Sequence, residues 1–157
     1  MTWSEMRKKL EQEYLADCLC GKIQYFVTRY RESHDAAGRA SILMDGKEIL
    51  QGNHWNAECP TYPICYDRYG PLNDEKLDAG AFDEGDFYGA FREFDNQSIE
   101  ESLQSKDLLV RIFAILDRRV GKRRLLQMKE TIENEPKHFQ AFFAIRMEAE
   151  GLLTEKA

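Results

Sequence analysis

Long apolar runs are absent from this sequence of 157 residues. A helix that spans a bilayer needs about 20 mostly apolar residues, and no segment approaches that length. The first nine residues also lack the apolar core of a secretion signal. We therefore expect a cytoplasmic protein that makes no membrane contact.

Motifs of nucleotide cofactors and of the common hydrolases are missing too. The chain contains no Gly-x-Gly-x-x-Gly, Walker loop, His-Glu-x-x-His or Gly-x-Ser-x-Gly. These motifs cradle phosphates, hold a zinc ion or present a nucleophilic serine. We predict no cofactor and no catalytic residue set, and we favour a protein that is not an enzyme.

Cysteine is scarce, and a chain of this length can bury a core without disulfides, so reduced thiols are expected. The four cysteines are Cys18, Cys20, Cys59 and Cys65. With His34 and His54 they suggest a zinc site as an alternative. However, Cys-x-Cys differs from the spacing of zinc knuckles, which favours free thiols and no metal.

The remaining composition is that of an ordinary globular domain, with 43% hydrophobic and 32% charged residues. Nine Phe, seven Tyr and two Trp predict a core rich in aromatic side chains. The net charge of −6 argues against a broad basic surface that follows nucleic acid. We expect one domain over residues 1–157.

The first part of the chain, residues 1–52, predicts a helix followed by a three-stranded antiparallel meander. Thr2 and Glu5 have the spacing of a capping box, and apolar residues then recur every three or four positions. Residues 23–30 and 39–44 are rich in β-formers. Asp45-Gly46 predicts a type I′ turn before a third strand at 47–50, because both positions tolerate positive φ.

The second part predicts an irregular loop over residues 53–80, with a short strand around 62–66, and then four or five helices over 81–157. Phe87, Phe91 and Phe94 follow helical spacing, and Ser98 opens a second capping box. We expect Gly121 in a left-handed conformation after one helix, and Pro136 at the first position of the last. The fold class is α+β.

The densest positive charge in the chain lies in residues 118–124, which we call the basic turn. Its cations are Arg118, Arg119, Lys122, Arg123 and Arg124. Arginine forks suit phosphate or carboxylate, so the turn is a candidate anion site. The alternative is structural: the cations complement a helix end or pair with Asp117, Glu130 or the carboxylates of residues 83–95.

Carboxylates are concentrated between residues 74 and 95, where they alternate with aromatic residues. If the phenylalanines point inward, the charges should crowd the outer face and attract a cationic partner. The candidate partner-binding residues are Asp83, Glu84, Asp86, Tyr88, Glu93 and Asp95. The alternative is that they only solvate the helix.

A third cluster brackets the loop between the first two strands and includes Arg29, His34 and Arg39. Arginines there could hold an anion beside a histidine base. No nucleophile stands at a recognisable spacing, and Asp35 is better placed to form a turn or to pair with Arg39.

Several segments together resemble an uncharacterised bacterial family of small soluble cytoplasmic proteins with no assigned activity. They are Thr2-Trp3-Ser4, Thr28 to Arg31, Ser33-His34-Asp35, Gly38-Arg39-Ala40, Asp45 to Glu48 and Leu116 to Leu125. The resemblance implies a cytoplasmic bacterial protein and transfers no catalytic residue.

From the sequence we expect a macromolecule-binding protein. Its most concrete form is an immunity- or antitoxin-like inhibitor that covers a cationic protein with the acidic aromatic helix. The alternatives are a nucleic-acid or phosphate binder that uses the basic turn, and a hydrolase or transferase centred on His34, Arg29 and Arg39.

Overall fold

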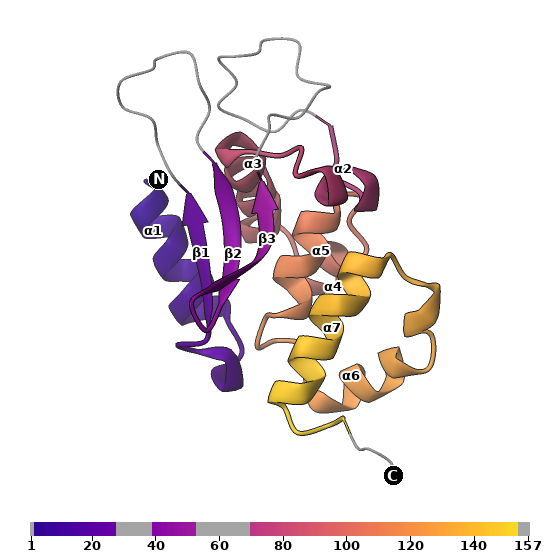
Figure 1. Ribbon diagram of the computed structural model, residues 1–157. Coiled ribbons are helices and arrows are strands. Elements are labelled where there is room, and N and C mark those ends of the chain that lie inside the picture. The colour runs from indigo at the N-terminus through magenta and orange to yellow at the C-terminus, as the bar shows by residue number, and fades with distance from the viewer. Residues whose placement is uncertain (1, 28–38, 53–69, 154–157) are drawn as a thin grey trace, which may run out of the picture.

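The computed structural model describes residues 2–27, 39–52 and 70–153 (Figure 1). The first part contains α1 (Trp3–Lys8), the π-helix η1 (Lys9–Tyr14), the 3-10 helix η2 (Asp17–Leu19) and strands β1 (Ile23–Val27), β2 (Ala40–Met44) and β3 (Lys47–Gly52). The second part contains α2 (Asp74–Ala79), α3 (Glu84–Asp95), α4 (Ile99–Leu103), α5 (Leu108–Ile115), α6 (Lys122–Lys129), η3 (Ile132–Asn134) and α7 (Lys137–Ala149). This order confirms the α+β fold.

The N-terminal helix begins as the sequence predicts, because the Thr2 hydroxyl accepts a hydrogen bond from the Glu5 amide at 3.3 Å. It continues as η1 and buries Met6 and Leu10. In Figure 1 the helix lies beside β1. A Glu11 carboxylate oxygen accepts from the Tyr25 amide at 2.7 Å, so the helix also satisfies a backbone donor of that strand.

The sheet is the predicted antiparallel meander in the order β1-β2-β3. Asp45 and Gly46 both have positive φ, at 51° and 83°, which confirms the turn between β2 and β3. A bulge shifts the β2–β3 register between Ile42 and Leu43. Residues 28–30 of the expected first strand and the expected strand at 62–66 lie outside the described residues.

Helix α2 corrects the expectation of an irregular segment up to residue 80. The Asn73 side chain accepts from the Lys76 amide at 2.9 Å, and Gly80 ends the helix with φ 68°. Both are ordinary helix signals. At six residues the helix is too short to show a clear apolar period, so the nearby Pro and Gly residues dominated the prediction.

The aromatic core joins the sheet to the helices around Phe113 of α5. Its ring contacts Tyr25, Phe87 and Phe94 edge to face, with centroids 5.4 to 5.9 Å apart. Phe87, Phe91 and Phe94 are at most 2% exposed, which confirms the inward face predicted for α3. Such tilted ring pairs add to the stability gained from burial.

The basic turn connects α5 to α6, so a break in the helix before Gly121 is confirmed, but the predicted conformation of this glycine is wrong. Gly121 has φ −86° and ψ 172° and forms the N-cap of α6. The chain has already left α5 at Leu116, so Gly121 has to start a helix and is extended. Similarly, Pro136 is the N-cap of α7 and not its first helical residue.

The N-terminal segment and the basic turn pair along their backbones. Leu15 and Asp117 form an isolated antiparallel bridge. The Ala16 amide donates to the Leu116 carbonyl at 2.9 Å, and the Arg118 amide donates to the Tyr14 carbonyl at 2.7 Å. Main-chain hydrogen bonds therefore join the N-terminal segment to the start of the basic turn.

Among the described residues, no helix has both the length and the apolar character needed to cross a bilayer.

Candidate functional site

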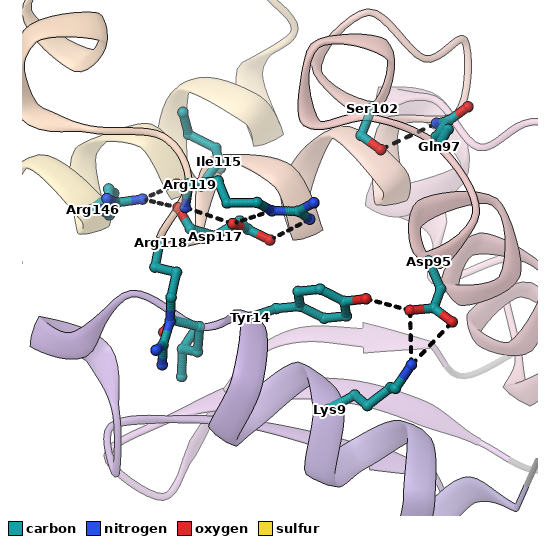
Figure 2. Close-up of polar contacts among 11 residues, drawn as sticks. Lys9, Tyr14, Asp95, Gln97, Ser102, Ile115, Asp117, Arg118, Arg119 and Arg146 are labelled. Carbon is teal, nitrogen blue, oxygen red and sulfur yellow. Dashed lines mark hydrogen bonds and ion pairs between the residues drawn. The ribbon is translucent and has the colours of Figure 1, made fainter.

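Arg119 of the basic turn is held inside the protein's own framework. Its guanidinium donates to both carboxylate oxygens of Asp117, at 3.0 and 2.8 Å, and that carboxylate is fully buried (Figure 2). The same guanidinium lies 4.9 Å from the ring centroid of Tyr14 and 5.6 Å from that of Phe94. This arrangement supports the structural alternative for Arg119, because a bidentate, stacked arginine keeps little capacity for a ligand.

Two further arginines of the turn have internal partners. Arg118 donates to the carbonyls of Leu15 and Gln12, at 3.2 and 3.0 Å, and so reinforces the pairing with the N-terminal segment. Arg124 pairs with Glu100 of α4 at 3.2 Å. The contacts of Arg118 and of Arg124 are partly exposed, so each contributes little stability. Together they orient the turn.

Arg146 of α7 supports the basic turn from inside the protein, a role that the sequence analysis did not predict. It is only 2% exposed and donates to the carbonyls of Ile115 and Asp117, at 2.9 and 2.8 Å (Figure 2). It also donates to the carbonyl of Val120, at 2.5 Å. Glu150 accepts from its Nε at 2.8 Å. A signal existed, since Arg146 occupies a position on the apolar face of α7.

The cations of α6 other than Arg124 point outward. Lys122, Arg123 and Lys129 are exposed and, within the part of the chain that the structure describes, make no ion pair. Leu126, at 46% exposure, lies four residues after Lys122 and three before Lys129, so the three share one side of the helix. We call Lys122, Arg123, Leu126 and Lys129 the α6 outer face.

Helix α6 is attached to the protein by few apolar contacts. Leu125 is its only buried residue, and Met128 packs partly against the core. An eight-residue helix that buries so little apolar surface gains most of its stability from neighbouring structure. Its outer face is therefore available for a partner.

The carboxylates at the start of α3 do not form the expected outer surface. Asp83, Glu84 and Asp86 are 5%, 3% and 1% exposed. Asp83 accepts from the amides of Gly85 and Asp86, at 2.8 and 3.3 Å, and Asp86 accepts from the Asp83 amide at 2.9 Å. These bonds form a capping box whose side chains lie inside the protein, which explains why Asp83 and Asp86 are buried. The outward orientation expected for Asp83, Glu84 and Asp86 is wrong.

The other members of that set have internal contacts as well. Tyr88 is 8% exposed. Glu93 accepts from the hydroxyl of Ser105, at 2.5 Å, and from the amide group of Gln97, at 3.1 Å. Asp95 holds the Tyr14 hydroxyl and the Lys9 ammonium, which is 3.2 Å from the nearer oxygen (Figure 2). Burial and the hydrogen bond with Asp95 raise the pKa of Tyr14 to about 12.

Asp83 offers a test of this inward arrangement, because burial raises the pKa of its carboxyl to about 6. Asp83→Asn keeps a capping oxygen and removes the buried charge, so it should raise the free energy of unfolding at pH 7 by about 2 kcal/mol. The stability contributed by protonated Asp83 is complete below pH 3.8 and is lost as the pH rises through about 6.

The advantage of Asp83→Asn should therefore shrink as the pH falls from 7 to 4. Urea unfolding of both proteins at several pH values measures it. Asp45→Asn, in the exposed turn, is the matched control. An advantage that does not change with pH would contradict a buried, charged Asp83.

The loop cluster is only partly described. Arg29 and His34 lie outside the described residues, whereas Arg39 pairs with Glu48 across the β2–β3 hairpin. Cys18 and Cys20 are free thiols, and Cys59 and Cys65 lie outside the described residues. Burial raises the pKa of the Cys18 thiol, which lowers its reactivity. The described residues contain no group of three or more His, Cys, Asp or Glu side chains placed to hold a metal ion.

Among known protein families, the SF0329 protein family matches residues 2–147, and this match covers most of the chain. No curated protein and no solved structure matches the sequence.

Proposed function

We propose that this chain, which belongs to the SF0329 protein family, is a non-enzymatic binding protein that contacts an acidic protein partner through the α6 outer face. We also propose a bacterial, cytoplasmic setting, which rests on the sequence alone.

The observation that carries the proposal is an exposed leucine among cations that have no internal partner. Leu126 is 46% exposed on a helix whose only buried residue is Leu125. Protein interfaces commonly combine an apolar anchor with a charged rim that steers association. Lys122, Arg123 and Lys129 would supply such a rim, and its charge selects a partner with carboxylates around an apolar pocket.

The same contacts favour a protein over a nucleic acid. Of the five cations in the basic turn, Arg118, Arg119 and Arg124 already have partners, which leaves Lys122 and Arg123. Nucleic-acid affinity grows with the number of phosphates neutralised, and two or three cations on a chain with net charge −6 supply little.

The inhibitor expected from the sequence stays a prediction, but it needs another surface. Asp83, Glu84 and Asp86 are buried and present no face of their own to a cationic protein. A hydrolase or transferase around Arg39 gains no support, because that side chain pairs with Glu48.

Charge reversal on α6 tests the proposal. Lys122→Glu, Arg123→Glu and Lys129→Glu together should abolish capture of one specific protein from nuclease-treated lysate of the native host. Leu126→Ser alone should weaken that capture by about thirtyfold, the loss of a typical hot-spot residue. Affinity purification with quantitative mass spectrometry measures both effects.

The matched control reverses three exposed lysines of the first part of the chain, Lys8, Lys22 and Lys47, and changes the net charge equally. It should leave capture of the same protein intact. Equal losses in the two triple variants, or capture of nucleic acid alone before nuclease treatment, would refute the proposed surface.

A further inference from the structure

The segment η1 is a π-helix of six residues that continues α1. In a π-helix the amides bond to carbonyls five residues earlier, whereas those of an α-helix bond to carbonyls four residues earlier. Helix α1 keeps the α pattern up to its C-cap, where the Lys9 amide bonds to the Glu5 carbonyl. The hydrogen-bond register therefore changes within one continuous helical segment. Such changes are rare and are frequent at functional sites.

The π register brings two side chains to one carboxylate. Lys9 and Tyr14 are five residues apart, and both bind Asp95, the last residue of α3 (Figure 2). In an α-helix successive residues are about 100° apart, so two residues with this separation point about 140° away from each other. An α-helical η1 could therefore place Lys9 or Tyr14 on Asp95, but not both.

Tyr14 also connects η1 to the basic turn. Its carbonyl accepts from the Arg118 amide at 2.7 Å, and its ring centroid lies 4.9 Å from the Arg119 guanidinium. Its hydroxyl donates to Asp95. A change of register that turns Tyr14 away from Asp95 moves the ring and the carbonyl at the same time, so the basic turn would lose both contacts together.

We propose that η1 is a two-state element that switches between this π register and an α register, and that Asp95 holds it in the π register. The carboxylate binds Lys9 and Tyr14 together only in the first state. Hydrogen bonds to a charged group are about twice as strong as neutral ones, so Asp95 supplies a large preference for that state. In the α register Tyr14 leaves Asp95, and the turn that leads into α6 is held less firmly.

The other anchor of η1 is compatible with both registers. Glu11 pairs with Arg7 at 2.9 Å, at the four-residue spacing of an α-helix, and accepts from the Tyr25 amide at 2.7 Å. The two registers therefore share the start of η1 and differ in the residues after Glu11. Glu13 lies in that later part, is exposed and makes no ion pair within the part of the chain that the structure describes.

Couplings across hydrogen bonds, measured by NMR on the full-length labelled protein, test the proposal because they identify the carbonyl that accepts from each amide. In the wild type the Tyr14 amide should couple to the carbonyl five residues earlier. In Asp95→Ala it should couple to the carbonyl four residues earlier. Exchange of the Arg118 amide with solvent should then rise about tenfold to a hundredfold, the effect of losing one hydrogen bond to a charged group.

Deletion of Glu13 should give the opposite result. Lys9 and Tyr14 are then four residues apart, so an α-helix can place both on Asp95. Exchange of the Arg118 amide should stay within about twofold of the wild-type rate. Adding Asp95→Ala to this deletion should leave the register unchanged, because no alternative register remains to be populated.

Two further variants complete the test. Tyr14→Phe keeps the ring and removes only the hydroxyl, so it should act in the same direction as Asp95→Ala with less risk to folding. Glu100→Ala removes an exposed carboxylate that pairs with Arg124 and should change neither reading. A five-residue acceptor that persists in both Asp95→Ala and Tyr14→Phe, or a four-residue acceptor in the wild type, would overturn the proposal. These readings need no partner of α6, so they are independent of the capture experiment.

Discussion

Replacing Arg146 by methionine is expected to lower the free energy of unfolding by about 3–5 kcal/mol, the usual cost of removing one member of a buried ionic network. Methionine fills a similar volume but donates no hydrogen bond. The carbonyls of Ile115, Asp117 and Val120 would lose their bonds to the guanidinium, and Glu150 would lose its ion pair with Arg146. Unsatisfied buried acceptors cost more than the bonds contribute when made.

Urea unfolding measures this loss, and Arg123→Met is the matched control. Arg123 undergoes the same chemical change on the α6 outer face and should alter stability by less than about 0.5 kcal/mol. Arg146→Lys should recover little, because one ammonium group on a flexible stem replaces a planar fork. A loss below about 1 kcal/mol for Arg146→Met would show that the turn does not depend on this side chain.

Gly52→Ala is the second change with a large expected effect. We expect it to lower the free energy of unfolding by about 3 kcal/mol or more. A Cβ at this position would lie 2.5 Å from the Phe82 carbonyl oxygen and 2.7 Å from two carbons of the Phe82 ring. A side chain could move away cheaply, but a backbone oxygen cannot, so β3 and the segment before α3 must separate. Overpacking of this kind usually costs 1–3 kcal/mol, and here the obstacle is rigid.

Gly121→Ala provides the contrast for Gly52. Nothing lies within 4 Å of a Cβ at residue 121, and its φ of −86° suits any residue. We expect a change of about 1 kcal/mol or less, from a slightly poorer N-cap. Thermal unfolding of both variants makes the comparison, and circular dichroism reports the fold if Gly52→Ala does not unfold cooperatively. Equal stability of the two variants would contradict the contact with Phe82.

Local signals in the sequence predicted most of the fold. The Asp45-Gly46 turn and the helical spacing of Phe87, Phe91 and Phe94 depend on neighbours a few residues away, and the structure confirms them. The conformation predicted for Gly121 was wrong because a glycine between helices fits either a helix end or a helix start. The choice depends on where α5 ends, which the distant Arg146 and the N-terminal segment determine.

The candidate sites were harder to predict, because charge in a sequence does not reveal burial. Asp83, Glu84 and Asp86 have the composition of a solvated face, yet they lie inside. Arg119 belongs to the most cationic segment, but Asp117 two residues earlier neutralises it. Only the structure shows which cations already have internal partners, so the α6 outer face could not be identified from the sequence.

The backbone pairing between residues 14–16 and 116–118 has a consequence for synthesis of the protein. Residues 14–16 leave the ribosome early, but their main-chain partners, residues 116–118, are about 100 residues further along the chain. During translation the N-terminal segment has to wait with unpaired amides and exposed apolar side chains. Closing so long a loop is slow, and a nascent chain in this state is a substrate for chaperones.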